Sequence, residues 1–357
     1  MRPERLLRAP GKRRLQAWLN RIWYGGSRWY LLLLPLSYVY GAIAGFRRAL
    51  YERGILKIQT AAAPVVIIGN ITAGGTGKTP LTVWLAEQLQ QRGLRPGVVL
   101  RGYGADVGDA PLRVSADSDA GLVGDEALLL ARRLRCPVVV HPDRLAAANA
   151  VVALGANVVL ADDGLQHYGL ARDFEIAVID AARGFGNKRL LPAGPLREPI
   201  ARLETVDTVA VQQGHDTGKV LRREGDPTEL QFRLVPSGVH SMHSDAVRDL
   251  QDFRGQKMHA VAGIGNPERF FRMLEAHGVE IIKHALPDHA AISQDDLEFD
   301  DGLQVIMTEK DAVKCQRLDT DRCWYVAVSV EFNDARSRSL LDVLHNDLRH
   351  AIAARAS

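Results

Sequence analysis

The feature that most constrains the fold is an apolar strand followed by a glycine-rich turn that ends in Gly-Lys-Thr. Residues 65–68 read Val-Val-Ile-Ile, and the turn runs from Gly69 to Thr79. Glycines in such a turn let backbone N–H groups converge on phosphate oxygens at the positive end of the next helix. Apolar residues at helical spacing follow it, which completes the expected strand, turn and helix. The segment is predicted to bind ATP or GTP.

The turn has one irregularity. The usual G-x-x-x-x-G-K-[ST] spacing puts a glycine where this chain has Thr72, so Gly74 and Gly75 must supply the conformational freedom. Lys78 offers a positive charge to the outer phosphates, and the Thr79 hydroxyl can ligate Mg²⁺. An ordinary glycine-rich turn between a strand and a helix is the alternative. The predicted nucleotide-binding residues are Thr72, Gly74, Gly75, Thr76, Gly77, Lys78 and Thr79.

Short apolar runs alternate with helical patterns after the turn. This rhythm predicts an α/β fold, a P-loop NTPase-like parallel sheet covered by helices on both faces, with ligands at the carboxyl ends of the strands. Polar motifs follow three of the runs, at Arg101-Gly102-Tyr103-Gly104, at residues 141–144 and at residues 162–167. We therefore expect the functional site to gather at this edge of the sheet.

The length of 357 residues, 46% of them hydrophobic, allows two domains with separate cores. The three cysteines lack C-x-x-C spacing, which argues against a disulfide framework or a zinc site and fits a reducing compartment. The predicted divisions are a basic and aromatic membrane-associated segment (1–57), a kinase core (58–228), an extended connector (229–252) and a smaller α/β domain with a closing C-terminal helix (253–357).

Residues 1–57 carry 12 Lys/Arg against 2 Asp/Glu, together with three of the five tryptophans. Within them, Trp29 to Phe46 is a run of 18 residues without a charge. Aromatic and basic residues around an apolar run are typical of a membrane interface, whereas a full crossing conflicts with the positive-inside tendency in either orientation. We expect monotopic or peripheral attachment to a membrane surface, with the catalytic body on the cytoplasmic side, and neither nucleic acid nor an obligate protein partner. A cleaved signal peptide and an apolar helix packed on the protein are the alternatives.

Two aspartates end an apolar strand at Asp162 and Asp163, where a Walker B carboxylate would hold Mg²⁺ opposite the phosphate loop. A turn before Gly164 is the alternative explanation. Asp125, at a helix start, is a candidate base for the hydroxyl of an alcohol that receives a γ-phosphoryl group, although an acidic first turn also complements the helix dipole. His289 is a candidate of the same kind.

The run from Arg183 to Pro199 has too many glycines, prolines and basic residues for a core element, so it is predicted to be a binding loop. Its arginine and Asn187 side chains suit phosphate or sugar hydroxyl groups, and Glu198 could join the metal site. A solvated loop is the alternative. Guanine specificity is not supported, because residues 308–311 (Thr-Glu-Lys-Asp) place the lysine one position too late for an [NT]-K-x-D motif.

Taken in order, these motifs resemble those of the tetraacyldisaccharide 4′-kinase family, the lipid A 4′-kinases. The resemblance spans nearly the whole chain, and the Thr72 irregularity fits that family's own phosphate loop. The motifs that carry it are Gly69-Asn70-Ile71-Thr72 with Gly74 to Pro80, Arg101-Gly102-Tyr103-Gly104, Gly124-Asp125-Glu126, Asp162-Asp163-Gly164-Leu165-Gln166-His167, the Arg183 to Pro199 loop, and Thr308-Glu309-Lys310-Asp311-Ala312-Val313-Lys314.

The resemblance implies phosphorylation, dependent on ATP and Mg²⁺, of the 4′-hydroxyl of an acylated glucosamine disaccharide 1-phosphate at the cytoplasmic face of the inner membrane. It implies Asp125 as the base, assisted by His289, with Lys78 on the transferred group. It also implies Thr79, Asp162 or Asp163, and Glu198 as residues that bear on Mg²⁺. The predicted substrate contacts are Arg144, Gln166, Asn187 and Arg197.

In the mechanism that we expect, the smaller unit closes over the larger one to complete the site and exclude water. The main alternative is a membrane-bound ATPase switch that uses nucleotide to control partner binding. A third possibility is a membrane-attached scaffold with a decayed nucleotide site, which the joint presence of Lys78, Thr79, Asp162 and Asp163 disfavours.

Overall fold

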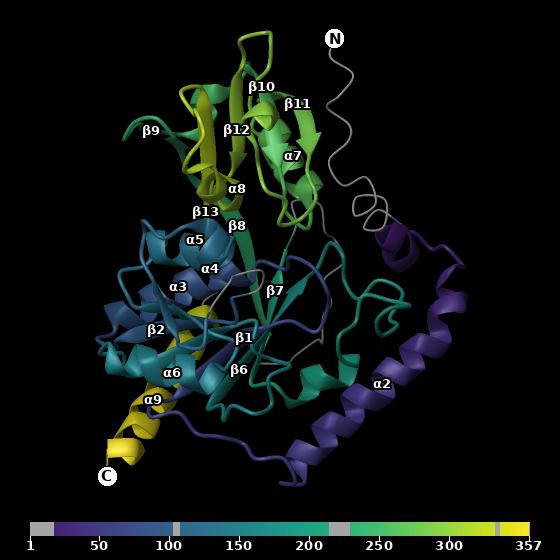
Figure 1. Cartoon of the computed structure of the whole chain (residues 1–357), viewed down its shortest axis with the longest axis vertical. Coiled ribbons are helices and arrows are strands. Elements are labelled where there is room, and N and C mark those ends of the chain that lie inside the picture. The colour runs from purple at the N-terminus through teal and green to yellow at the C-terminus, as the bar shows by residue number, and fades with distance from the viewer. Residues whose placement is uncertain (1–17, 103–107, 214–228, 333–335, 357) are drawn as a thin grey trace.

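The computed structural model describes residues 18–102, 108–213, 229–332 and 336–356. Its strands form one 13-stranded sheet that continues through two lobes (Figure 1). Tyr103 and Gly104 of the second predicted motif lie outside the described residues, as do residues 1–17 of the basic segment and residues 214–228 before the predicted connector.

The first lobe contains six parallel strands in the order β7-β6-β1-β5-β2-β4, with β3 antiparallel at the edge. The strands are almost wholly buried, as expected for a parallel sheet covered on both faces, and the predicted fold class is confirmed. Their bounds are β1 (Val65–Gly69), β2 (Pro96–Leu100), β3 (Leu112–Val114), β4 (Val138–Val140), β5 (Val158–Asp162), β6 (Phe174–Asp180) and β7 (Thr208–Gln212).

Helices cover the two faces of this sheet with separate apolar clusters. One cluster includes buried residues of α3 (Lys78–Gln91), α5 (Asp125–Arg133) and α9 (Arg336–Ala356), and the other includes those of α6 (Arg144–Ala153). The C-terminal helix was grouped by sequence with the smaller domain, but its apolar residues Leu341, Leu344 and Leu348 pack in the core of the first lobe. The remaining short elements are α4 (Ala120–Val123) and the 3₁₀ helix η2 (Ile200–Thr205).

The second lobe is built on the parallel strands β11-β10-β12, with β13 beside β12. Its α7 helix (Pro267–Ala276) begins directly after Asn266, and Pro267 fixes the first turn. The other elements are η3 (Leu250–Phe253), β9 (Val247–Arg248), β10 (Lys257–Ala262), β11 (Glu280–Ala285), η4 (Gln294–Asp296), β12 (Gln304–Thr308), α8 (Glu309–Ala312) and η5 (Val313–Cys315).

Two long strands, β8 (Glu229–Ser241) and β13 (Cys323–Phe332), join the lobes. The start of β8 pairs in parallel with β7, and the rest pairs antiparallel with β13. Phe232 and Phe332 face each other where β8 passes from one lobe to the other, with ring centroids 6.0 Å apart. This antiparallel ribbon is a continuous backbone connection between the two lobes.

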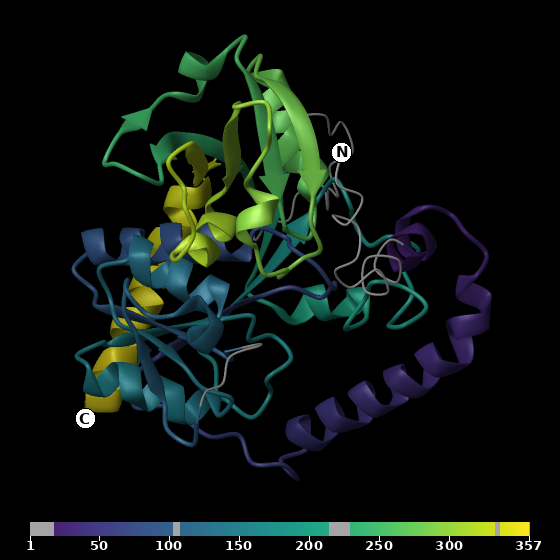
Figure 2. The same ribbon diagram turned by 45° about the horizontal axis from the view of Figure 1, so that its top comes forward.

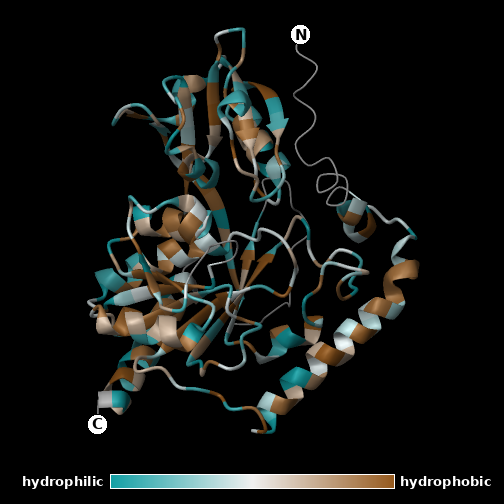
Figure 3. Ribbon diagram, in the orientation of Figure 1, coloured by the Kyte–Doolittle hydropathy of each residue, from teal (hydrophilic) through white to brown (hydrophobic). Residues whose placement is uncertain are grey.

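The α2 helix (Tyr30–Glu52) lies along the outside of the first lobe (Figures 1 and 2). It is the one helix in the described part of the chain that is long and apolar enough, by length and composition, to cross a membrane. Most of its apolar side chains are exposed, and Figure 3 shows the hydrophobic colouring along it. This helix and a preceding helical stretch at residues 18–24 cover most of the predicted membrane-associated segment.

Candidate active site

The phosphate loop links the end of β1 to the start of α3, as the sequence predicts. Gly74 and Gly77 have φ values of 112° and 83°, which favour glycine, whereas Thr72 does not adopt a positive φ. Thr72 is buried and forms an antiparallel bridge with Leu196 of the predicted binding loop. The irregular position therefore needs no glycine, because the residues that need positive φ come after it.

Lys78 and Asp163 join the phosphate loop to the acidic strand end. Lys78 Nζ lies 3.3 Å from Asp163 Oδ1, and Arg197 Nη1 lies 3.0 Å from each Asp163 oxygen. Although burial raises the pKa of Asp163, the charges of Lys78 and Arg197 outweigh it and hold the pKa at about 2. Asp163 therefore stays ionised and fixes both basic side chains at the carboxyl end of β5.

Asp162 is the neighbouring carboxylate, and its environment is the opposite. Its side chain is buried, and neither oxygen has a hydrogen-bond partner. Burial, followed by the charge of Glu126, raises its pKa to about 7 despite the nearby Lys78. A buried orphaned carboxylate beside a phosphate loop fits a hard cation such as Mg²⁺, which prefers oxygen ligands. Within the described ranges no three His, Cys, Asp or Glu residues group closely enough to hold a metal alone. Asp162 therefore suits a cation whose other ligands are phosphate oxygens and water.

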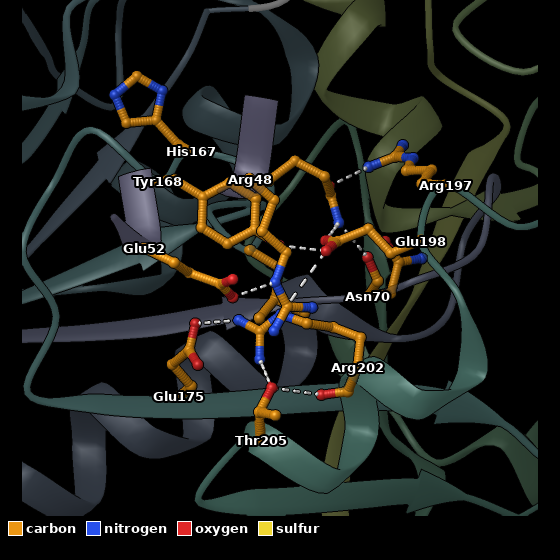
Figure 4. Close-up of polar contacts among 12 residues, drawn as sticks. Arg48, Glu52, Asn70, His167, Tyr168, Glu175, Arg197, Glu198, Arg202 and Thr205 are labelled. Carbon is orange, nitrogen blue, oxygen red and sulfur yellow. Dashed lines mark hydrogen bonds and ion pairs between the residues drawn. The ribbon is translucent and has the colours of Figure 1, made fainter. Parts of the chain in front are cut away.

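Glu198 lies in a buried polar network, shown in Figure 4. Tyr168 donates its hydroxyl hydrogen to Glu198 Oε2, and Gln166 Nε2 donates to Oε1 at 2.8 Å. Arg202 Nε is 3.6 Å from Oε2, and burial together with the bond to Glu198 raises the pKa of Tyr168 to about 12. Both carboxylate oxygens are thus occupied by protein groups, which differs from the metal role that the resemblance implies.

Gln166 connects this network to the phosphate loop. Its amide also donates to the Asn70 carbonyl at 3.0 Å, and its Oε1 accepts from Arg197 Nη1 at 3.4 Å. Gln166 and Asp163 therefore orient the same guanidinium from two sides. Of the four predicted substrate contacts, Arg197 is the one that bonds to the Asp163 carboxylate, which also holds Lys78.

Arg144 has partners that differ from the predicted phosphate contact. Its guanidinium is buried and donates to the carbonyls of Val99 (3.0 Å), Asp162 (2.8 Å) and Asp163 (3.3 Å). Burial lowers its pKa to about 10. Arg144 therefore ties the ends of β2 and β5 together beneath the two aspartates, and it bears on the site through their backbone.

Asn187 also has structural partners. Its Nδ2 donates to the carbonyls of Ala193 (2.8 Å) and Ile22 (3.4 Å), and its Oδ1 accepts from the Arg189 amide at 3.1 Å. The backbone amide of Asn187 bonds to the Trp23 carbonyl at 2.9 Å. The side chain shapes the binding loop and attaches it to the helical stretch at residues 18–24.

Asp125 and His289 come from different lobes and meet in the structure. Asp125 begins α5 in the first lobe, and His289 follows β11 in the second; Nδ1 of His289 is 3.1 Å from each Asp125 oxygen. Burial opposes ionisation of Asp125, but the His289 hydrogen bond, Lys310 and Lys314 lower its pKa to about 2. The same hydrogen bond raises the pKa of His289. The structure thus brings together the two candidates for proton transfer.

Lys310 and Lys314 were not predicted as site residues. Lys310 Nζ is 2.8 Å from Glu126 Oε1 and 3.4 Å from His289 Nε2, while Lys314 is 2.8 Å from Asp311 and 3.8 Å from Asp125. Residues 308–314 do not match the guanine-specificity motif, but they are one of the motifs that resemble the kinase family. Their alternating acidic and basic residues were the available signal, but only the tertiary structure carries them across to α5.

Comparison with known proteins identifies the family. The family model described as tetraacyldisaccharide-1-P 4′-kinase matches residues 29–346. A tetraacyldisaccharide 4′-kinase from Nitrosococcus oceani is 47% identical over 329 residues, covering 91% of this chain and 93% of that protein. One from Hahella chejuensis is 44% identical over 342 residues, covering 93% and 98%.

A solved structure supports the same assignment. The crystal structure of LpxK from Aquifex aeolicus in complex with ATP is 27% identical and matches with a TM-score of 0.74, covering 89% of this chain and 99% of that one. The family match extends over most of the chain, and several relatives exceed 40% identity over nearly their whole length. The predicted resemblance is confirmed, and this chain belongs to the tetraacyldisaccharide 4′-kinase family.

Proposed function

We propose that this chain transfers the γ-phosphoryl group of ATP to the 4′-hydroxyl of an acylated glucosamine disaccharide 1-phosphate, a step of lipid A biosynthesis. The observation that carries the proposal is the convergence of Lys78, the Asp162–Asp163 pair and Asp125 between the two lobes. Family membership supports the identity of the phosphoryl acceptor. An ATPase switch has no specific observation in its favour.

In this reaction the protein mainly positions groups and stabilises charge. The phosphate loop holds the triphosphate, and Lys78 offers its ammonium group to the transferred phosphoryl group. Thr79 and Asp162 would hold Mg²⁺, which would neutralise phosphate charge when bound. Asp125 accepts the proton of the sugar hydroxyl, and His289 holds the carboxylate in position through its Nδ1 hydrogen bond.

Arg197 is the residue that we assign to direct substrate contact, because its guanidinium lies between Asp163 and Gln166 at the edge of the phosphate loop. Gln166 and Asn187 would act by shaping the surface that receives the sugar, and Arg144 by holding the strand ends. Glu198 would influence Mg²⁺ by fixing Gln166. These assignments predict that substitution of Arg197 lowers kinase activity more than substitution of any of the other four residues.

The proposed activity is tested with γ-labelled ATP and a tetraacylated disaccharide 1-phosphate in detergent micelles. We expect label in the extracted lipid with the wild-type protein, and a loss of about 10³-fold or more with Lys78→Ala, since the charge on the transferred group is removed. The matched control is Lys257→Ala, an exposed lysine of the second lobe. Label released only as inorganic phosphate would contradict the kinase assignment and favour the switch.

The apolar α2 helix and the family both fit membrane association. We propose that α2 lies in one leaflet of the inner membrane and keeps the catalytic body on the cytoplasmic side, where ATP is present. On one face, Ser37 and Tyr40 donate hydrogen bonds to the carbonyls of Leu190 and Arg197 at 2.8 and 3.0 Å. A helix tied along its length to the catalytic body has one face left for lipid, which suits attachment better than crossing.

The lipid face of α2 consists of exposed apolar residues that recur every three or four positions: Leu32, Leu36, Val39, Ile43 and Phe46. Each apolar side chain of this size is worth about 1.5–3 kcal/mol when fully buried. The triple change Leu32→Ser, Leu36→Ser and Ile43→Ser is therefore expected to weaken partition into anionic vesicles by at least about a hundredfold. Sedimentation with vesicles measures the partition.

The control for this experiment is Val343→Ser, an exposed apolar residue on α9. It should leave vesicle binding unchanged. Wild-type binding that disappears in high salt, or a triple variant that still sediments fully, would contradict an apolar anchor.

A further inference from the structure

A glycine turn of the second lobe lies directly against the phosphate loop. The turn Gly263-Ile264-Gly265 joins β10 to the residues before α7. A Cβ atom added to Gly265 would come 2.9 Å from the backbone nitrogen of Gly75 and 3.3 Å from Asp288 Oδ2. The two turns therefore pack backbone against backbone, with no room for a side chain. This contact joins the second lobe to the phosphate loop of the first lobe.

Two arginines cross between the lobes beside this contact, in opposite directions. Arg269, on α7 of the second lobe, forms an ion pair with Asp180 and donates to Gln212 Oε1 at 2.7 Å. Arg183, in the first lobe, donates to the Gly265 carbonyl at 2.5 Å. We call Arg183, Arg269, Asp180 and Gln212 the interlobe latch.

The latch reaches the phosphate loop through side-chain packing. Gln212 ends β7 and is 1% exposed; a Cβ added to Gly77 would come 2.7 Å from its Oε1. Gly77 immediately precedes Lys78. On the other side of the loop, a Cβ added to Gly74 would come 3.1 Å from Arg183 Nη1. The two arginines thus bracket the loop that is assigned to the triphosphate.

Electrostatics favours the closed arrangement. Asp180 ends β6 and is 2% exposed, so its carboxylate needs a partner, and Arg269 provides one from the second lobe. Opening would separate this ion pair, and the Asp180 carboxylate would then depend on water as its partner. The free-energy cost of separating this pair therefore favours the closed arrangement of the lobes.

The latch is one of several groups of contacts between the lobes. A second group includes the pairs Arg133–Glu309, Lys310–Glu126 and His289–Asp125, at the start and end of α5. A third joins Arg317 to Asp119 and Gln316 to Ser118. If the latch is removed, the second lobe keeps those contacts and the β8–β13 ribbon, but it loses the contacts that bracket the phosphate loop. The expected defect is therefore in closure and not in folding.

We propose that Arg269, supported by Arg183, is a positioning residue that holds the closed lobe arrangement, in which the Gly265 turn covers the phosphate loop and His289 reaches Asp125. Neither arginine is asked to take part in the chemical step. The expected effect of the latch on turnover rests on the proposed function. The expected effect of the latch on lobe closure does not depend on the identity of the phosphoryl acceptor.

The test compares Arg269→Gln, Asp180→Asn and the double variant, in full-length detergent-solubilised protein. Small-angle X-ray scattering with a non-hydrolysable ATP analogue reports closure, and labelled-lipid formation reports kcat and KM. We expect the analogue to compact the wild type. We expect Arg269→Gln to abolish this compaction and to lower kcat about 10- to 100-fold, because the closed state becomes a minor one. The double variant, with a neutral amide pair, should recover compaction and part of kcat.

Arg272→Gln is the matched control, because Arg272 is exposed on the same helix and, among the described residues, bonds to the Glu268 carbonyl in its own turn. It should behave as wild type. Compaction and kcat within twofold of wild type in Arg269→Gln would overturn the proposal, as would a double variant no better than Arg269→Gln. If Arg269→Gln shows no cooperative thermal unfolding transition and is therefore not folded, Arg183→Gln provides the same test. If the wild type labels no lipid but Arg269→Gln still loses compaction, the kinase assignment is contradicted and the proposal about the latch is supported.

Discussion

Replacing Asp125 with asparagine is expected to lower kcat by about 10²- to 10⁴-fold, the range of general acid–base catalysis, while the affinity for ATP changes little. Asparagine keeps the shape of the side chain and can still accept a hydrogen bond from His289, but it cannot take up the proton of the sugar hydroxyl. The contact with His289 spans the two lobes at 3.1 Å. Steady-state kinetics with the lipid acceptor and a fluorescent nucleotide titration separate the two effects.

His289→Gln provides the comparison, because His289 acts on the reaction through Asp125. Its loss of kcat should be smaller than that of Asp125→Asn, and the double variant should be no worse than Asp125→Asn alone, as expected for residues that act as a unit. Asp117→Asn, at an exposed position before α4, is the control for loss of an acidic side chain. A kcat for Asp125→Asn within threefold of wild type would remove Asp125 from the role of base.

The same pair predicts a pH dependence of the interlobe contact. The pKa of Asp125 is lowered to about 2, so its contribution to stability is present above its ordinary pKa of 3.8 and is lost as the pH falls toward 2. The pKa of His289 is raised from 6.5, so its contribution is complete below 6.5 and is lost as the pH rises through the raised value. The contact is therefore strongest between about pH 4 and pH 6.5, and it weakens as the pH rises toward the raised pKa of His289.

The parts of the site that could be predicted from sequence are those fixed by local structure. A run such as residues 65–68 followed by Gly74, Gly77 and Lys78 specifies a strand, a turn with positive φ and a helix start, and all three occur within one short segment. Asp162 and Asp163 were found for the same reason, since a parallel strand must present its carboxyl end to the site. Here the local pattern and the tertiary fold impose the same arrangement.

The parts that could not be predicted depend on side-chain direction or on contacts between lobes. Arg144 follows a strand end as a phosphate-binding arginine would, but its guanidinium turns inward to three carbonyls. Glu198 is adjacent to Arg197, yet it is held by Tyr168 and Gln166. The Arg269–Asp180 pair joins residues far apart in the chain, and neither belongs to a motif. Periodicity and spacing carry no information on these choices.

Replacing Asp162 with asparagine is expected to inactivate the enzyme and to stabilise the metal-free protein. The carboxylate is buried without a hydrogen-bond partner, and burial raises its pKa to about 7. In the proposed mechanism Mg²⁺ held by Asp162 would contribute several kcal/mol to the stabilisation of the transition state, so kcat should fall about 10³-fold. In the metal-free protein at pH 8 the buried charge of Asp162 destabilises the fold, because no cation compensates for its loss of hydration. Its removal should raise the free energy of unfolding by roughly 1–3 kcal/mol.

The pH and the neighbouring aspartate make the Asp162 prediction specific. Because the pKa of Asp162 is raised, its ionisation destabilises the metal-free fold progressively as the pH rises from about 4 to about 7. The advantage of Asp162→Asn should therefore shrink as the pH falls and vanish below about pH 4. Mg²⁺ with an ATP analogue should raise the Tm of wild type more than that of the variant. Asp163→Asn should instead lower the Tm, since it removes the partner of Lys78 and Arg197. Equal shifts for the two variants would contradict the assignment of Asp162 to the cation.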